Sequence, residues 1–472
     1  MKPGIKIIGY VLLTAILPGC MLMGPDYQRP VFSLPAIFIS DDVAAADQAP
    51  LTAESPWWEL YQDPVLNDLV TQALENNTDI RIAVARIEEA DAFLREVGAA
   101  LFPQVDLDAA GSRSRITQRG ANPLINGVNP IRENYTIRLG ASYELDFWGK
   151  LRRAKESARA QTMASRYARD TVALSLSGLV VSNYLQLRSL ESQIALSEDS
   201  LRTRNESLAL TRKRLEGGVS SALDVHQAEV ASSNLAAQIV ELKRLRAVSQ
   251  NQLAVLTGRL DLSLPVGDIS QLPLPPLPPA GLPSNLLEAR PDVRQAEQEL
   301  VAQNANIGVA KAALFPTISL TATYGGESAE LGDVLKSAAR IWSGGLGLNL
   351  PIFNAGRLSA RVDQATAQQK QALAAYEASV RTAFQEVNDA LVSVRQNAER
   401  EALLDSSRQA AKKALDISDN RYKSGYSAYI DVLDSQRVYN DAAIAYIQSR
   451  QARLIASVDL FKALGGGWQD KY

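Results

Sequence analysis

Residues suited to catalysis or metal binding are scarce in this 472-residue chain, which contains one cysteine, Cys20, and one histidine, His226. An intrachain disulfide needs two cysteines, and a zinc site built from Cys and His needs several such ligands. Any Ser–His or Cys–His catalytic pair would have to use His226. We find no catalytic constellation, cofactor motif or metal-binding motif, and we predict that the protein is not an enzyme.

The most distinctive chemical cluster is acidic. Asp431 and Asp434 are three residues apart and would share one face of a helix, and Asp224 precedes a valine just as Asp431 does. Rings of carboxylates supplied by several copies of a chain favour cations in a pore. The second interpretation is that Asp224 and Asp431 favour helix N-termini through the helix macrodipole, and both interpretations can hold together.

Two other features lie close to Asp224. His226 follows it by two residues, and we interpret this side chain as facing solvent or a lumen. Pairing with a carboxylate to sense pH is the alternative. The basic run Arg212–Arg214 is interpreted either as a solvated helix face or as a contact for a partner protein.

The composition is that of a folded chain. Hydrophobic residues make up 46% and charged residues 21%, which excludes a disordered chain and a many-helix membrane protein. The formal net charge of -3 argues against a nucleic-acid binder, which usually carries a basic excess.

The N-terminus has the features of a bacterial export signal. Lys2 and Lys6 precede the apolar run Ile7 to Leu17, which is too short to span a bilayer, and Cys20 follows. This order resembles a lipobox, in which the cysteine becomes lipidated and starts the mature protein. We therefore predict a signal peptide over residues 1–19 and a lipidated N-terminal linker over 20–60. By resemblance to enterobacterial lipoprotein sorting, Met21 rather than Asp after Cys20 implies the outer membrane of a Gram-negative bacterium.

The chain contains an internal repeat at an offset of roughly 210 residues. Ala99–Pro103 returns as Ala312–Pro316, and Gly218 returns as Gly425 within matching Arg-x-x-x-Gly motifs. Each half predicts a helix, two strands, a long helix and a shorter helix. The predicted segments are repeat 1 over 61–257, a Pro-rich linker over 258–284, repeat 2 over 285–464 and a C-terminal tail over 465–472.

Each half also predicts two strands. Tyr135 to Trp148 alternates strictly between apolar and polar residues, and weaker alternation occurs at Val105–Gly111, Ile318–Tyr324 and Trp342–Ile352. A lipid-facing barrel needs about eight strands, and an eight-stranded barrel is filled by side chains. A conducting pore therefore favours at least three copies, which share a twelve-stranded barrel. The alternative is a soluble sheet packed on the helices.

The helices are unusually long. Residues 151–215 contain one glycine and no proline, and residues 358–423 contain neither, so each predicts a helix of roughly 100 Å. Heptad spacing of apolar residues indicates coiled-coil packing. Turns at Gly218 and Gly425 precede returning helices at 220–256 and 427–464, and helices are also predicted at 65–98 and 285–313. The predicted fold is a membrane β-barrel with a coiled-coil helical tunnel.

Several motifs together resemble the TolC-like outer-membrane efflux lipoproteins. The resemblance covers essentially the whole mature chain. It rests on Gly24–Pro30, Trp57–Pro64, Leu314–Pro316, Leu350–Gly356 and Ala463–Trp468. The resemblance implies a homotrimer with a twelve-stranded barrel and a periplasmic α-barrel. It also implies two partners, a periplasmic adaptor and an inner-membrane pump of the RND type, and no nucleic acid.

The resemblance also implies roles for individual residues. Asp224 and Tyr422 match positions that constrict the periplasmic aperture, and Asp431 and Asp434 match a double acidic ring. Ser427 stands where the best-known family member has an arginine. We therefore expect the outer-membrane exit duct of a tripartite system for drugs, solvents or other small molecules.

Other functions remain open from the sequence. Within ducts, the alternatives are metal-ion efflux and type I polypeptide secretion. Outside this class, they are a structural coiled-coil lipoprotein and a secreted enzyme on a long scaffold.

Lipidation of Cys20 is directly testable, because this residue is the only cysteine and follows the apolar segment of the signal. Cells that express the wild-type protein should incorporate radiolabelled palmitate into it, and Cys20→Ser should abolish that labelling. Persistent labelling of the variant would contradict lipidation at Cys20.

Overall fold

The computed structural model describes residues 22–33, 35, 38, 56–117, 119, 127–276, 288 and 290–467. Cys20 and most of the predicted signal and linker lie outside these residues. The first repeat contains η1 (Trp57–Tyr61), α2 (Pro64–Asn76), α3 (Thr78–Ala99), β1 (Gln104–Arg115), β2 (Ile131–Leu145), α4 (Lys150–Glu216) and α5 (Ala222–Leu256). After η2 (Ile269–Gln271), the second contains α7 (Pro291–Ala312), β3 (Thr317–Ser328), η4 (Leu331–Asp333), η5 (Ser337–Ala339), β4 (Arg340–Asn349), α8 (Arg357–Lys423) and α9 (Tyr429–Ala463).

This order confirms the predicted fold class of strand pairs between long helices. In space the chain forms two compact units, each of which takes residues from both repeats. The sheet unit draws on residues 1–31, 87–165 and 296–376, and the hairpin unit on 32–86, 166–295 and 377–472.

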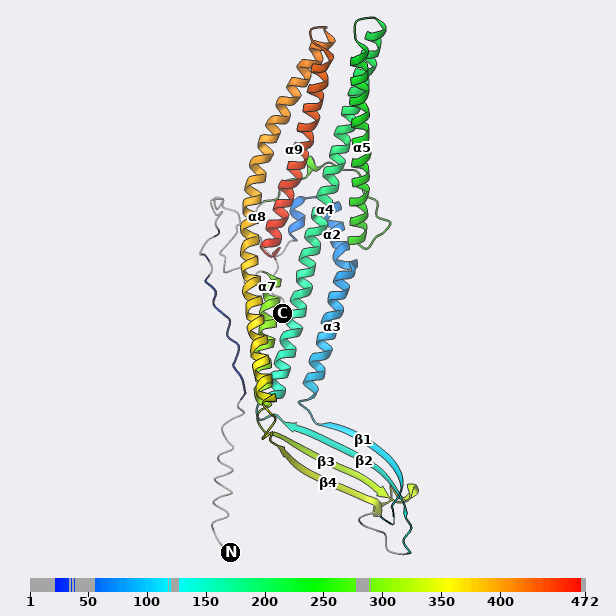
Figure 1. Ribbon diagram of the computed structural model, residues 1–472, viewed down its shortest axis with the longest axis vertical. Helices are drawn as coiled ribbons and strands as arrows, with labels where there is room; N and C mark the ends of the chain where they lie inside the picture. The colour runs from blue at the N-terminus through cyan, green and yellow to red at the C-terminus, as the bar shows by residue number, and fades with distance from the viewer. Residues whose placement is uncertain are drawn as a thin grey trace. The chain divides into compact units, whose positions relative to one another are not determined.

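The sheet unit contains one antiparallel sheet in the order β1-β2-β3-β4 (Figure 1). The central pairing of β2 with β3 joins the two repeats. Strands β1 and β4 are the outer strands of the described sheet, so each presents an edge for further pairing.

The two faces of this sheet differ in chemistry. One cross-strand row consists of large apolar residues: Leu107, Leu139, Tyr324 and Trp342. Their exposed fractions in the single chain are 70%, 48%, 57% and 80%. The adjacent row, which points to the opposite face, is polar or small: Asp106, Gly140, Thr323 and Ser343. The sheet therefore has an apolar face that the described residues leave uncovered.

Two helical hairpins, α4–α5 and α8–α9, repeat the same design (Figure 1). Each joins a 67-residue helix to a 35-residue helix. Within the part of the chain that the structure describes, no helix combines the length and apolar character needed to cross a membrane.

The helix predicted over residues 65–98 is in fact two helices. Asn77 separates α2 from α3 in an extended conformation with ψ of 137°. Its side-chain oxygen accepts a hydrogen bond from the Asp79 amide at 2.7 Å, and its side-chain nitrogen donates to the Leu256 carbonyl at 2.9 Å. Asn77 therefore caps α3 and ties it to the end of α5, a tertiary contact that the helical sequence pattern does not reveal.

The motif at Trp57–Pro64 builds the core of the hairpin unit. Trp57 stacks on Phe461 of α9 with ring centroids 5.4 Å apart, and the fully buried Tyr61 hydroxyl lies 2.8 Å from Ser457 Oγ. Asp63 caps α2 by accepting a hydrogen bond from the Val65 amide and also accepts one from the Tyr184 hydroxyl of α4. These motif residues fasten the N-terminal segment to α4 and α9.

The motif that begins at Gly24 packs on the sheet unit. Gly24 has φ of +87°, and a Cβ at this position would lie 2.6 Å from the Gly308 Cα of α7. Arg29 Nε donates to Glu297 Oε1 at 2.6 Å, and Asp26 pairs with the buried Arg153 at 2.6 Å. The close approach of the two glycines leaves no room for a side chain at Gly24.

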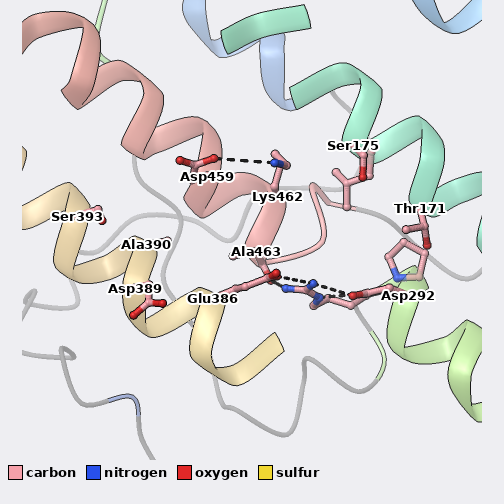
Figure 2. A pocket seen from close by; sticks show the side chains of 13 residues that line it. Thr171, Ser175, Asp292, Glu386, Asp389, Ala390, Ser393, Asp459, Lys462 and Ala463 are labelled. Atoms are coloured by element: carbon pink, nitrogen blue, oxygen red, sulfur yellow. Dashed lines mark hydrogen bonds and ion pairs between the residues drawn. The ribbon is translucent and has the colours of Figure 1, made fainter. Parts of the chain in front are cut away.

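The buried Arg290 links three segments of the hairpin unit at the point where α7 begins. Arg290 pairs with Asp292 and with Glu386 of α8, and it donates to the backbone oxygen of Ala463. Figure 2 labels these three partners. The two ion pairs are each 2.7 Å long, and the hydrogen bond to Ala463 is 3.1 Å. Arg290 therefore connects the start of α7 with α8 and the end of α9.

Candidate functional site

The predicted functional residues gather at the turns of the two hairpins. Gly218 and Gly425 occupy the turns with φ of +71° and +81°. In both turns the amide that follows the glycine donates to a carbonyl five residues back, Val219 to Arg214 and Tyr426 to Arg421, each at 2.8 Å. This is the Schellman ending of a helix, in which glycine avoids the strain of a left-handed conformation. We call this region of the hairpin unit the hairpin tips.

Asp224 lies in the first turn of α5, where it forms a capping box with Ser221. Its Oδ2 accepts hydrogen bonds from the Ser221 amide at 3.0 Å and from Ser220 Oγ at 2.9 Å. The hydrogen bond from the Ser221 backbone lowers the pKa of Asp224. The helix-terminus interpretation therefore has direct support in the geometry of Asp224.

The two acidic residues of α9 are both exposed, but their surroundings differ. Asp434 pairs with Arg437 at 2.8 Å, and Arg437 also lies 3.6 Å from Asp441. Asp431 lies in the first turn of α9, and its amide donates to the Ala428 carbonyl at 3.3 Å. Part of the charge at this position is thus neutralised within the chain.

Tyr422 is packed inside the chain rather than projecting from it. It is buried in a cluster with Ala228, Tyr429 and Val432, and its ring centroid lies 5.4 Å from that of Tyr429. Its hydroxyl is 3.3 Å from Thr211 Oγ1 of α4. In this conformation Tyr422 joins the two hairpins of one chain.

Arg214 completes this junction, and the sequence interpretation of a solvated helix face or a partner contact did not identify this role. Its guanidinium lies 4.3 Å from the centre of the Tyr422 ring. It donates hydrogen bonds at 3.2 Å to the carbonyls of Tyr422 and Lys423 at the end of α8. A cation at a helix C-terminus is favourable, so Arg214 caps α8 from the opposite hairpin. The repeated Arg-x-x-x-Gly motif was the available signal.

His226 is exposed and lies 3.1 Å from Glu229, through Nδ1 and Oε2. Glu229 also pairs with Arg212 at 2.8 Å, and the hydrogen bonds from Arg212 and His226 lower the pKa of this carboxylate. The histidine thus has a carboxylate neighbour on its own helix. Among the described residues, no group of three or more His, Cys, Asp or Glu side chains is placed to hold a metal ion.

Known proteins share both this sequence and this fold. Residues 69–259 and 282–466 match the family described as Outer membrane efflux protein. A toluene efflux pump outer membrane protein, TtgC of Pseudomonas putida, is 37% identical over 99% of this chain and 96% of its own length. The Escherichia coli cation efflux system protein CusC is 32% identical over 96% of this chain and 97% of its own length.

A solved channel has a similar fold. The Neisseria gonorrhoeae MtrE outer membrane channel, solved in its open state, superposes with a TM-score of 0.84 at 34% identity. The match covers 95% of this chain and 99% of that one.

The protein is therefore an outer-membrane efflux channel by class. More particularly, the chain belongs to the outer membrane efflux protein family, and it is the outer-membrane component of an efflux pump that extends into the periplasm. Membership in this family of channels confirms the resemblance to TolC-like proteins and the prediction that the protein is not an enzyme.

The capping role of Asp224 predicts a local, pH-dependent effect. Asp224→Ala removes the acceptor for Ser221 and Ser220, so we expect a loss of about 0.7 kcal/mol at the start of α5 and roughly threefold faster amide exchange there. Because the folded pKa is lowered, the contribution is complete at neutral pH and is lost as pH falls through that pKa.

Hydrogen exchange measured by mass spectrometry at pH 7 checks this prediction. Asp224→Asn, which keeps an acceptor, is the matched control and should lose less protection than the alanine variant. Equal exchange at the start of α5 in the wild type and Asp224→Ala would contradict the capping role.

Proposed function

We propose that three copies of the chain close a shared twelve-stranded barrel and that their long helices build a periplasmic tunnel, which together form the exit duct of a tripartite efflux system. The uncovered apolar face of the four-stranded sheet, with its two open edges, is the observation that carries this proposal. The row from Leu107 to Trp342 suits lipid, and the polar row from Asp106 to Ser343 suits a water-filled lumen.

The proposed number of chains follows from the need to close the barrel. One chain supplies four strands, which is below the size of known lipid-facing barrels, and two chains supply about eight, whose interior side chains would fill. Three chains give a lumen wide enough for solutes. Pairing β1 of one chain with β4 of the next would satisfy the backbone groups at both edges, as the hydrocarbon core requires.

We also propose that the hairpin tips meet the periplasmic adaptor, which connects the duct to an inner-membrane pump of the RND type. Four large apolar side chains at the tips are exposed in the single chain, namely Val219, Leu223, Tyr426 and Ile430. Exposed apolar patches of this kind support a role in protein–protein contact.

Small apolar or amphiphilic molecules, such as drugs and solvents, are the proposed substrates. The Pseudomonas putida relative named for toluene efflux supports this choice. Metal ions are the second candidate, favoured by the exposed Asp431 at the tips and by the Escherichia coli relative named for cation efflux. A lipid anchor at Cys20 would hold each copy at the outer membrane.

The duct function predicts ion conduction by the purified protein. In planar lipid bilayers, the wild-type assembly should produce discrete conductance steps, because a water-filled lumen conducts ions. Lipid bilayers with detergent alone are the control. A folded, inserted protein without conductance would point instead to a structural coiled-coil lipoprotein.

The acidic pair predicts cation selectivity. Changing Asp431 and Asp434 together to Asn keeps their shape while removing up to six charges from a trimer, so selectivity for cations and block by polyvalent cations added from the tip side should both fall. Reversal potentials in a salt gradient and current block provide the measurements. The matched control is Asp419→Asn. Asp419 pairs with Lys423 and lies outside the predicted ring. Unchanged selectivity and block in a folded trimer would leave only the helix-terminus role.

A further inference from the structure

A cavity of about 680 Å³ lies near the hairpin tips, bounded by α4, α5 and α9. Much of its wall is apolar and includes Leu223, Val230, Ile430 and Leu433. Ligand sites for drug-sized molecules are typically about 300–1,000 Å³, mostly apolar, with a few placed polar groups. The size and lining of this cavity match that description.

Arg204 of α4 supplies a buried positive charge to the wall. Its side chain is nine-tenths buried, with 9% of its surface exposed. Among the described residues its guanidinium makes one hydrogen bond, from Nη1 to the Ala231 carbonyl at 2.9 Å, and its Nε has no acceptor. Burial lowers the pKa of Arg204. Asp441 opposes that shift through its charge, but the buried Nε donor stays unsatisfied, and an acceptor bound beside it would reduce that cost.

A second polar side chain with an unsatisfied hydrogen-bonding atom lines the same cavity. Asn440 of α9 is 3% exposed, and its buried side-chain oxygen Oδ1 has no hydrogen-bond donor among the described residues. Buried polar groups are normally satisfied, so this amide and Arg204 together present capacity that the chain itself does not use.

The other charges of the wall largely neutralise one another. Asp434 pairs with Arg437 at 2.8 Å, and Arg437 lies 3.6 Å from Asp441. His226 faces Glu229 on its own helix. Asp441 also acts on Arg204 through its charge, so the wall is close to neutral, and what Arg204 offers a ligand is its unused hydrogen-bond donor.

We propose that this cavity binds a small amphiphilic monocarboxylate. The carboxylate accepts charge-assisted hydrogen bonds from the Arg204 guanidinium and the Asn440 amide, and the apolar body lies against Leu223 and Ile430. A planar carboxylate matches the planar guanidinium, and a single negative charge is enough to use the free donor of Arg204. The site is formed within one chain, so it does not depend on the proposed transport.

A pair of probes that differ in charge tests this site. Isothermal titration of the detergent-solubilised full-length assembly with 1-naphthylacetate and with the neutral 1-naphthylacetamide compares the same ring with and without a carboxylate. The acetate should bind roughly tenfold or more tightly than the amide. Arg204→Met should remove that preference, and Arg204→Lys should retain part of it.

The matched control is Arg212→Met, which removes an exposed arginine that pairs with Glu229 and does not line the cavity. It should leave both affinities unchanged. Asn440→Leu is the second site variant and should weaken the acetate more than the amide. If Arg204→Met fails to fold, the affinities of the two probes for the wild type and for Asn440→Leu still test the proposal.

Equal affinity of the wild type for the two probes would overturn the proposal, as would unchanged acetate binding in a folded Arg204→Met. Loss of bilayer conductance is a separate result that bears on the duct and not on this site.

Discussion

The constraint on which this structure depends is the need to cover the apolar face of a four-stranded sheet. The exposed row Leu107, Leu139, Tyr324 and Trp342 finds no cover in the described chain, and both outer strands present open edges. In the proposed barrel, lipid covers the apolar face, water meets the polar face, and neighbouring copies pair with the two edges.

The hairpin unit obeys a different constraint. Its helices are too long to be held by one core, so separate contacts fix them along their length. Trp57 and Phe461 anchor one region, Arg290 closes another, and Arg214 caps α8 from the opposite hairpin at the tips. The contact between Arg214 and Tyr422 joins the two hairpins of one chain.

Much of the fold could be predicted because it is encoded locally. Strict alternation marked the strand that contains Leu139, and the absence of proline marked α4 and α8. The break at Asn77 was missed, because asparagine there interrupts a helix through its contact with Leu256. The tips were found from glycines that repeat between the two halves.

The contacts at the hairpin tips could not be predicted from the sequence. Tyr422 was selected by resemblance, yet its burial against Tyr429 and Arg214 depends on how two hairpins meet. The unsatisfied Nε of Arg204 likewise depends on which side chains of α5 and α9 fail to reach it. Such contacts join residues that are distant in sequence, and no local pattern encodes them.

The number of chains in the conducting species tests the central claim most directly. Native mass spectrometry of the purified protein, released from detergent micelles, measures that number without assumptions about shape. The account predicts a mass of three chains, because three sheets of four strands close a barrel with a lumen. A folded, conducting species with the mass of a single chain would contradict it.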